Sequence, residues 1–260
     1  MSGTRVAIVT GGATGVGAAT AVELAQRGYA VAINYSRSKT EADETVAQCR
    51  RAGGDAIALQ GDVADDAACR ATVAAAVANF GRVDVLVNSA GTTQFVPLSE
   101  LDRQNAEDFQ KVYAVNVIGP YQMARAAAPH LRARGAGAIV NVSSIGSLNG
   151  NGSSYSYVTS KAALNTLTLA LARNLAPEIR VNAVLPGLIQ TRWLKNGLGE
   201  EAYARVRDGW EDAAALQKSC TAEDVAHMIV WLAADAPLVT GQLLTVDGGF
   251  LLGRPTRVAR

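Results

Sequence analysis

Two residues whose types are suited to proton transfer, Tyr157 and Lys161, stand four positions apart in the segment SSYSYVTSKAALNTLTLAL. Four residues make about one turn of an α-helix, so a helix here would project the phenol and the ammonium from one face. A cation about 4 Å from a phenol favours the phenolate by roughly 4 kcal/mol at an effective dielectric near 20. Desolvation opposes this effect, so the pair predicts a tyrosine base only if a second positive charge assists. Taken alone, the pair is better explained by a packed tyrosine beside a solvated lysine.

A glycine-rich segment, TGGATGVG, follows the first strand-like run VAIVT, and Gly11, Gly15 and Gly17 open the helix expected after it. Such a turn lets the backbone approach a pyrophosphate, while the helix N-terminus offers unpaired N–H donors and the positive end of the helix dipole. A tight structural turn is the alternative interpretation. The position in the first strand–helix unit favours nucleotide binding.

Short β-branched runs alternate with Ala- and Leu-rich helical stretches along the whole chain, a pattern typical of a parallel sheet wound with helices. No linker or change of composition divides the chain, so we predict one α/β domain over residues 1–260, doubly wound, with helices on both faces. The segment at about 188–218 follows a strand end and is predicted to be a substrate flap. Seven strands are expected: VAIVT, AVAINY, AIALQ, VDVLV, AIVNVSS, RVNAVLP and QLLTVDGG.

The glycine spacing G-x-x-x-G-x-G, together with Tyr157-x-x-x-Lys161, resembles the short-chain dehydrogenase/reductase family. Other motifs keep the family's order: NSAG at residues 88–91 where the family usually has NNAG, Ser144 thirteen residues before Tyr157, and PGLIQT at residues 186–191. The resemblance covers about residues 5 to 250 and implies a Rossmann fold. It is closest to the 3-oxoacyl-carrier-protein reductase branch, notably in NYSRS and SLNGNG.

The resemblance implies a catalytic set of Asn116, Ser144, Tyr157 and Lys161. Tyr157 would give a proton to a substrate carbonyl oxygen as hydride arrives from a nicotinamide, and take it back in the oxidising direction. Lys161 would lower the pKa of the phenol, with the oxidised nicotinamide as the second positive charge. Ser144 would polarise the carbonyl, and Asn116 would hold a water that relays protons.

The same resemblance implies a set of cofactor-binding residues. They are Gly11, Thr14, Gly15, Val16, Gly17, Arg37, Asp62, Val63, Asn88, Ala90, Gly91, Tyr157, Lys161, Pro186, Gly187, Ile189 and Thr191. The second strand ends in Asn34 and Tyr35, where a member preferring NAD would carry an acidic residue. Arg37 follows at once and would pair with a 2′-phosphate, so we predict NADP(H) over NAD(H). A solvated Arg37 is the alternative.

The predicted function is reduction of a ketone, including 3-oxoacyl thioesters, to a secondary alcohol. One alternative is an NAD(P)-dependent alcohol or sugar dehydrogenase, and another, of a different class, is a non-catalytic nucleotide sensor or scaffold. The substrate itself is not predicted. The candidates for contacting it are Gln94, Phe95, Asn149, Asn151 and Trp193.

The composition limits the partners of the chain. Lys and Arg number 24 against 23 Asp and Glu, which argues against nucleic acid or an anionic membrane as partner. The three cysteines and two histidines have no ligand spacing, so neither a metal site nor a disulfide framework is expected. We predict a cytoplasmic protein without a signal peptide or membrane span. The family resemblance, with the apolar helix after Tyr157, implies a homotetramer.

Overall fold

A seven-stranded parallel sheet forms the centre of the molecule in the computed structural model, which describes residues 3–254 apart from the Trp193 side chain. The strand order is β3-β2-β1-β4-β5-β6-β7, and every neighbouring pair is parallel. This confirms the predicted doubly wound α/β sheet. The strands are β1 (Val6–Thr10), β2 (Ala30–Tyr35), β3 (Ala56–Gln60), β4 (Val85–Asn88), β5 (Gly137–Val142), β6 (Ile179–Pro186) and β7 (Leu243–Val246).

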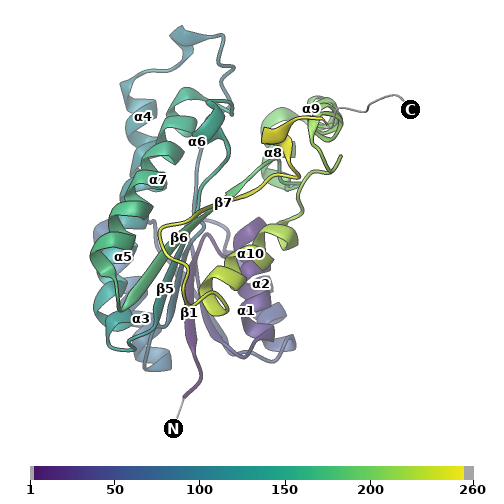
Figure 1. Ribbon diagram of the computed structural model, residues 1–260. Helices are drawn as coiled ribbons and strands as arrows, with labels where there is room; N and C mark the ends of the chain where they lie inside the picture. The colour runs from purple at the N-terminus through teal and green to yellow at the C-terminus, as the bar shows by residue number, and fades with distance from the viewer. Residues whose placement is uncertain (1–2, 255–260) are drawn as a thin grey trace.

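Helices cover both faces of the sheet: α1, α2 and α10 lie on one face, and α3, α5 and α7 on the other (Figure 1). The helices are α1 (Gly15–Gln26), α2 (Lys39–Arg51), α3 (Asp66–Phe80), α4 (Ala106–Tyr113), α5 (Gly119–Arg132), α6 (Gly146–Asn149), α7 (Tyr155–Leu175), α8 (Arg192–Leu198), α9 (Glu200–Ala213) and α10 (Ala222–Ala234). Two 3₁₀ turns, η1 (Leu101–Arg103) and η3 (Phe250–Leu252), and a π-helical turn, η2 (Ala114–Ile118), complete the described elements.

Strands β1 and β2 are buried along their whole length, as expected for central strands covered on both faces. Their side chains alternate between two apolar cores because successive residues of a strand point to opposite faces. Ala7 and Val9 belong to the core beneath α1 and α10, whereas Ile8 belongs to the core beneath α3 and α5. The packed sheet therefore fixes the positions of the side chains at the ends of its strands.

Some boundaries differ from the sequence-based expectation. Strand β5 ends at Val142 instead of Ser144. The Ser144 hydroxyl accepts a hydrogen bond from the Gly146 N–H at the start of α6. The segment expected to be a flap contains two helices, α8 and α9, that apolar periodicity did not predict. Helix α7 buries one stripe on the sheet and leaves Leu169 46% exposed.

None of the helices in residues 3–254 combines the length and the apolar character that crossing a membrane requires. Across the same part of the chain, no group of three or more His, Cys, Asp or Glu side chains is arranged to hold a metal ion. All three cysteines are unpaired and buried, and burial raises the pKa of each thiol to about 11.

Candidate active site

The carboxyl ends of three neighbouring strands, β1, β4 and β5, form the floor of the candidate site. Thr10 at the end of β1 pairs with Asn88 at the end of β4, and Asn88 pairs with Asn141 of β5. Strands β2 and β3 follow β1 on one side of the sheet, whereas β4 to β7 follow on the other. The order of the strands therefore reverses between β1 and β4, while all strands remain parallel. Ligands of open α/β sheets bind in the crevice at such a reversal. Residues far apart in the sequence therefore meet at this edge.

The glycine-rich turn between β1 and α1 forms a backbone cradle. Gly11 and Gly15 have φ values of +62° and +55°, which favour glycine. A Cβ on Gly11 would lie 2.8 Å from Ala90 Cα, and a Cβ on Gly17 would lie 2.3 Å from the Gly11 carbonyl oxygen. Only hydrogen atoms fit at these positions.

The start of α1 is suited to a negatively charged ligand. Thr14, at the N-cap, makes no side-chain capping hydrogen bond with a described residue, and the first turn carries no acidic side chain. Helix N–H donors and the positive end of the helix dipole thus face the cradle without competition from the protein's own carboxylates. The cradle fits the pyrophosphate of a dinucleotide.

The turn at residues 88–91 is ordered by a residue that the sequence did not single out. The Thr10 hydroxyl oxygen accepts hydrogen bonds from the N–H groups of Ser89 and Ala90, both at 3.1 Å. The Asn88 side chain donates to Asn141 Oδ1 at 2.9 Å, which ties the ends of β4 and β5 together. The position of Thr10 as the last residue of β1 is the only sequence signal for this role.

Several hydrogen bonds fix the first turn of α7 and thereby the position of Tyr157. The Ser154 hydroxyl caps the helix by accepting from the Tyr157 N–H at 3.2 Å. Gln104 accepts from the N–H of Tyr155 at 2.9 Å and donates to the Ser156 hydroxyl at 2.8 Å. A chain segment distant in sequence thus holds the start of this helix.

Tyr157, Ser144 and Lys161, three of the predicted catalytic residues, lie together in the candidate site. Burial raises the pKa of Tyr157, and a hydrogen bond with the Ser144 side chain opposes that change by lowering it. Burial lowers the pKa of Lys161 from 10.5 to about 8, and its Nζ donates to the Val142 carbonyl at 2.9 Å. Lys161 Nζ lies 5.7 Å from the centre of the Tyr157 ring. Without a second cation, desolvation therefore outweighs the attraction of Lys161 for a phenolate.

Asn116 lies in the π-helical turn η2 between α4 and α5, and it is completely buried. Its side chain accepts from the Thr92 N–H at 2.8 Å and donates to the Ser160 hydroxyl at 3.0 Å. That hydroxyl donates in turn to the Tyr157 carbonyl at 2.7 Å. Ser160, which the sequence did not single out, thus links Asn116 to the Tyr157 helix. A Cβ on Gly91 would lie 3.6 Å from both Asn116 Oδ1 and Lys161 Nζ, so both groups border one space.

Three of the predicted cofactor-binding residues, Arg37, Asp62 and Val63, lie just after β2 and β3. Arg37 is exposed in the loop before α2, and its guanidinium forms no ion pair within the described part of the chain. Asp62 accepts from the Ala64 N–H at 3.0 Å at the end of β3. Val63 is buried, and its carbonyl accepts from Gln122 at 3.0 Å.

The segment at residues 186–191 continues β6 toward the glycine turn. Gly187 leaves room for the Trp210 ring, because a Cβ there would lie 2.5 Å from it. Ile189 forms an isolated parallel bridge with Cys220. Thr191 comes close to the cradle, since a Cβ on Gly15 would lie 3.6 Å from its methyl group. The predicted cofactor-binding residues of segment 186–191 and the predicted pyrophosphate cradle therefore lie side by side.

The substrate candidates make contacts in different parts of the chain. The Gln94 side chain donates to Asp108 at 2.6 Å, and Asn149 accepts from the Asn151 N–H at 2.9 Å. Both asparagines are exposed. Trp193 belongs to α8, but its side chain lies outside the described residues. Phe95 contacts α8, where a Cβ on Gly197 would lie 2.0 Å from its ring.

Comparison with known proteins agrees with this geometry. Residues 11–251 match a family described as enoyl-(acyl carrier protein) reductase. The chain is 39% identical over 244 residues to a protein of Streptomyces violaceoruber named as a ketoacyl reductase of granaticin polyketide synthesis, covering 94% of this chain and 95% of that one. It is also 39% identical over 248 residues to an L-rhamnose 1-dehydrogenase (NAD(P)(+)) of a Sphingomonas species, covering 94% and 95% of the two chains. A crystal structure described as a short-chain dehydrogenase/reductase from Burkholderia xenovorans superposes with a TM-score of 0.90 at 41% identity, over 97% of this chain and 100% of that one.

Proposed function

Because the chain belongs to the short-chain dehydrogenase/reductase family, whose NAD(P)-dependent enzymes act on CH–OH groups, we propose that it reduces a ketone to a secondary alcohol with NADP(H). The ketones include 3-oxoacyl thioesters. The observation that carries the proposal is the hydrogen bond between Ser144 and Tyr157 at the crevice, with Lys161 and Asn116 bordering one space beside Gly91. A cytoplasmic location belongs to the same proposal.

The proposed mechanism assigns one task to each side chain. When bound, the nicotinamide supplies the hydride and, in its oxidised form, a positive charge. Tyr157 donates its phenol proton to the carbonyl oxygen, and Ser144 donates a hydrogen bond to the same oxygen, which stabilises the charge that develops there. Lys161 holds its ammonium beside the phenol, and Asn116 holds the water through which the proton is replaced.

The opposite direction, oxidation of an alcohol or sugar, uses the same residues and is the second candidate. The identity of 39% to the relative named as a rhamnose dehydrogenase supports this candidate. That identity equals the one to the relative named as a ketoacyl reductase, so identity does not choose between the two directions. The two are separated by giving the purified protein NADPH with 3-oxoacyl thioesters and simple ketones, and NADP⁺ or NAD⁺ with sugars and secondary alcohols. Ketone-dependent oxidation of NADPH supports the proposal. Turnover confined to sugars would replace it with the second candidate.

The preference for NADP(H) rests on Arg37, the exposed cation at the end of β2, and on the absence of an acidic side chain at the buried Asn34 and Tyr35 before it. We expect Arg37→Gln to raise the KM for NADPH about tenfold, the loss of one charge-assisted contact, without changing the KM for NADH. Arg51→Gln, at the exposed far end of α2, is the control. Equal changes for both cofactors, or none, would rule out a 2′-phosphate contact by Arg37.

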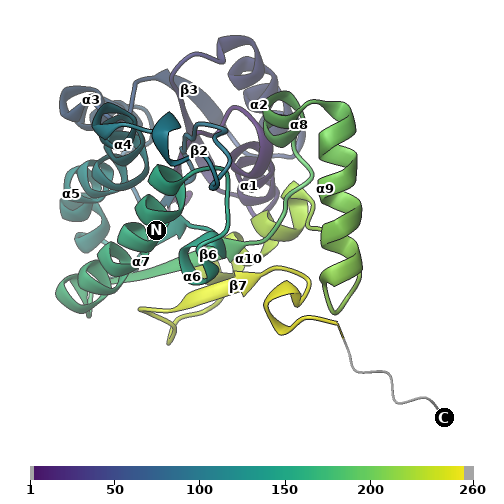
Figure 2. The same cartoon turned by 90° about the horizontal axis from the view of Figure 1, so that it is seen from above.

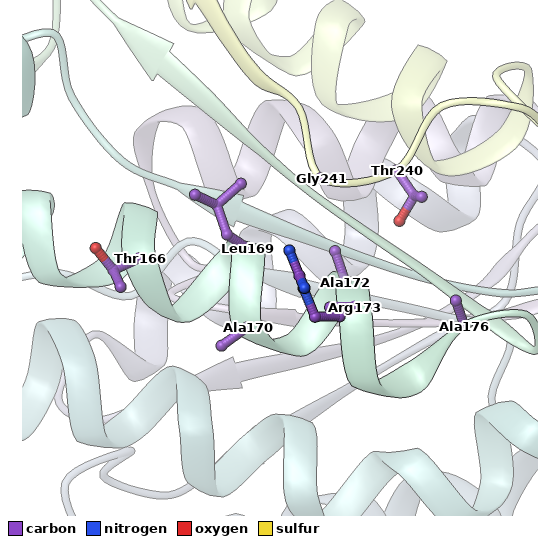
Figure 3. Close-up of a pocket in the computed structure, with 8 residues that line it drawn as sticks. All are labelled: Thr166, Leu169, Ala170, Ala172, Arg173, Ala176, Thr240 and Gly241. Atoms are coloured by element: carbon purple, nitrogen blue, oxygen red, sulfur yellow. The ribbon is translucent and has the colours of Figure 1, made fainter.

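A homotetramer is the proposed assembly, and the surface of α7 supports it. Two grooves flank this helix. One is lined by Thr166, Leu169, Ala170, Ala172, Arg173, Ala176, Thr240 and Gly241 (Figure 3), and the other by Tyr121, Ala124, Arg125, Ala128, Pro129, Arg132, Leu171 and Leu175. Leu169 and Tyr121 are 46% and 45% exposed, a high value for large apolar side chains on adjacent helices.

We expect Leu169→Glu to lower the oligomeric state, because it places a charge in an apolar contact. Sedimentation velocity measures the change. Gln48→Glu, on the exposed side of α2 across the sheet, adds the same charge and should leave the assembly intact. A wild-type protein that sediments as a monomer would contradict the proposed assembly.

A further inference from the structure

An ion pair connects the flap to the cofactor-binding half of the molecule. Arg192, the first residue of α8, donates to the Glu41 carboxylate in the first turn of α2 at 2.6 Å, across 151 residues of sequence. Figure 2 shows α8 beside α2 when the sheet is viewed from above. The Arg192 guanidinium also holds the pKa of Glu41 below its usual value.

The other contacts of α8 place it across the crevice. Just before the helix, the Thr191 methyl group lies near the pyrophosphate cradle, as the spacing to a Cβ on Gly15 shows. Near the end of the helix, Gly197 fits against the Phe95 ring in the segment that follows β4. Helix α8 thus runs from the α2 side of the crevice to the β4 side, and a dinucleotide in the cradle would lie beneath it.

Partly buried contacts hold the base of the flap, where residues 188–190 and 210–220 meet. At the far end of α9, the Trp210 ring stacks on Phe250 with centres 3.7 Å apart and planes at 6°. The Glu211 carboxylate accepts from the Ser219 hydroxyl at 2.6 Å, and that hydroxyl accepts from Gln190 at 2.9 Å. These contacts are at least partly buried.

The contact between α8 and α2 is instead an ion pair whose Arg and Glu side chains are 57% and 31% exposed. Exposed pairs are weak and are screened by salt. If α8 moves away from α2, this ion pair is the contact that breaks.

We propose that Arg192 and Glu41 are positioning residues that fasten α8 across the crevice, so that their ion pair sets the rate at which the nicotinamide dinucleotide leaves. The pair contacts α2 and α8 and none of the reacting groups. The inference therefore depends neither on which carbonyl is reduced nor on the preference for NADP(H).

The rival explanation is that Arg192 binds the phosphates of the dinucleotide directly. The two explanations predict opposite effects of neutralising Glu41. If the pair fastens the flap, Glu41→Gln and Arg192→Gln both speed release. If Arg192 binds the dinucleotide, Glu41→Gln frees the guanidinium and slows release, whereas Arg192→Gln speeds it.

The experiment measures release of NADPH and of NADH from the full-length protein by stopped-flow fluorescence. We expect Glu41→Gln and Arg192→Gln each to raise the dissociation rate about 1.5- to 5-fold, the range for exposed ion pairs, and the double variant to add nothing further. Asp43→Asn is the matched control. It breaks an ion pair on the same helix, in which Lys39 Nζ lies 2.7 Å from an Asp43 carboxylate oxygen. Opposite effects of the two variants, or an equal effect of the control, would overturn the proposal.

A second measurement needs no cofactor. Amide hydrogen exchange in residues 192–198 of the cofactor-free protein should be faster in Glu41→Gln than in wild type or Asp43→Asn, because fastening slows opening of this segment. Unchanged exchange there would show that the pair does not hold α8. Failure of the ketone assay would leave both measurements meaningful, since neither depends on turnover.

Discussion

Replacing Tyr157 by Phe is expected to lower kcat by a factor of about 10² to 10⁴, the usual contribution of a positioned general acid or base. The change removes one oxygen atom and leaves the ring in place beside Lys161. The α7 capping bond is retained, because Ser154 accepts from the backbone N–H of Tyr157. Steady-state kinetics in the productive direction measure the loss, and fluorescence titration with NADPH checks that the cofactor still binds.

Tyr155 offers a matched control two residues away. Its hydroxyl donates to the Leu98 carbonyl at 2.9 Å, and its side chain is partly exposed, so Tyr155→Phe removes the same atom outside the site. We expect full turnover in this variant. A Tyr157→Phe protein that binds cofactor and keeps wild-type turnover would exclude Tyr157 as the proton donor.

Replacing Lys161 by Met is expected to abolish most turnover without destabilising the cofactor-free protein at pH 7. Lys161 is 5% exposed, and its pKa falls from 10.5 to about 8 on burial. The folded state therefore loses about 3 kcal/mol by keeping this ammonium charged. Methionine removes that cost but leaves the Val142 carbonyl without its donor, which costs about 1–3 kcal/mol. The net change should lie between zero and a gain of about 2 kcal/mol.

The effect of pH on this variant has a definite sign. A lysine whose pKa is lowered in the folded state reduces the free energy of unfolding. This loss is complete below about pH 8 and disappears as pH rises from about 8 to 10.5. The stability of Lys161→Met relative to wild type should therefore be highest near pH 7 and fall toward pH 10. Urea unfolding of the cofactor-free proteins at pH 7 and pH 9.5 measures the difference. A variant less stable by several kcal/mol at pH 7 would show that Lys161 stabilises the fold.

The sequence was sufficient for the sheet, because its strands are apolar runs separated by long amphipathic or Ala-rich stretches. Of the residues predicted for the site, Asn116 and Lys161 border one space beside Gly91, and Lys161 Nζ lies 5.7 Å from the centre of the Tyr157 ring. Within a helix, the spacing between two residues determines whether their side chains share a face. Tyr157 and Lys161, four residues apart in α7, are an example. The glycine turn was predictable from spacing as well.

The parts that the sequence did not predict depend on contacts between distant segments. Nothing local pairs Arg192 with Glu41, or Gln94 with Asp108. Helix α9 carries Tyr203, Val206 and Trp210 at helical spacing, but many charged residues separate them, and the segment was expected to be a flap instead of a helix. Ser160 escaped notice because a serine inside a helix more often bonds only to its own preceding turn.

The parallel register at the strand ends also has a consequence for how the chain reaches its native state. The hydrogen bonds that assemble the crevice join residues separated by 79 positions between Thr10 and Ser89, by 53 between Asn88 and Asn141, and by 44 between Asn116 and Ser160. Chains dominated by such distant pairings fold slowly. The entropy cost of closing a long loop arises before the stabilising contacts can form. The crevice exists only after β1, β4 and β5 have joined, so recovery of dinucleotide binding during refolding should report completion of the central sheet.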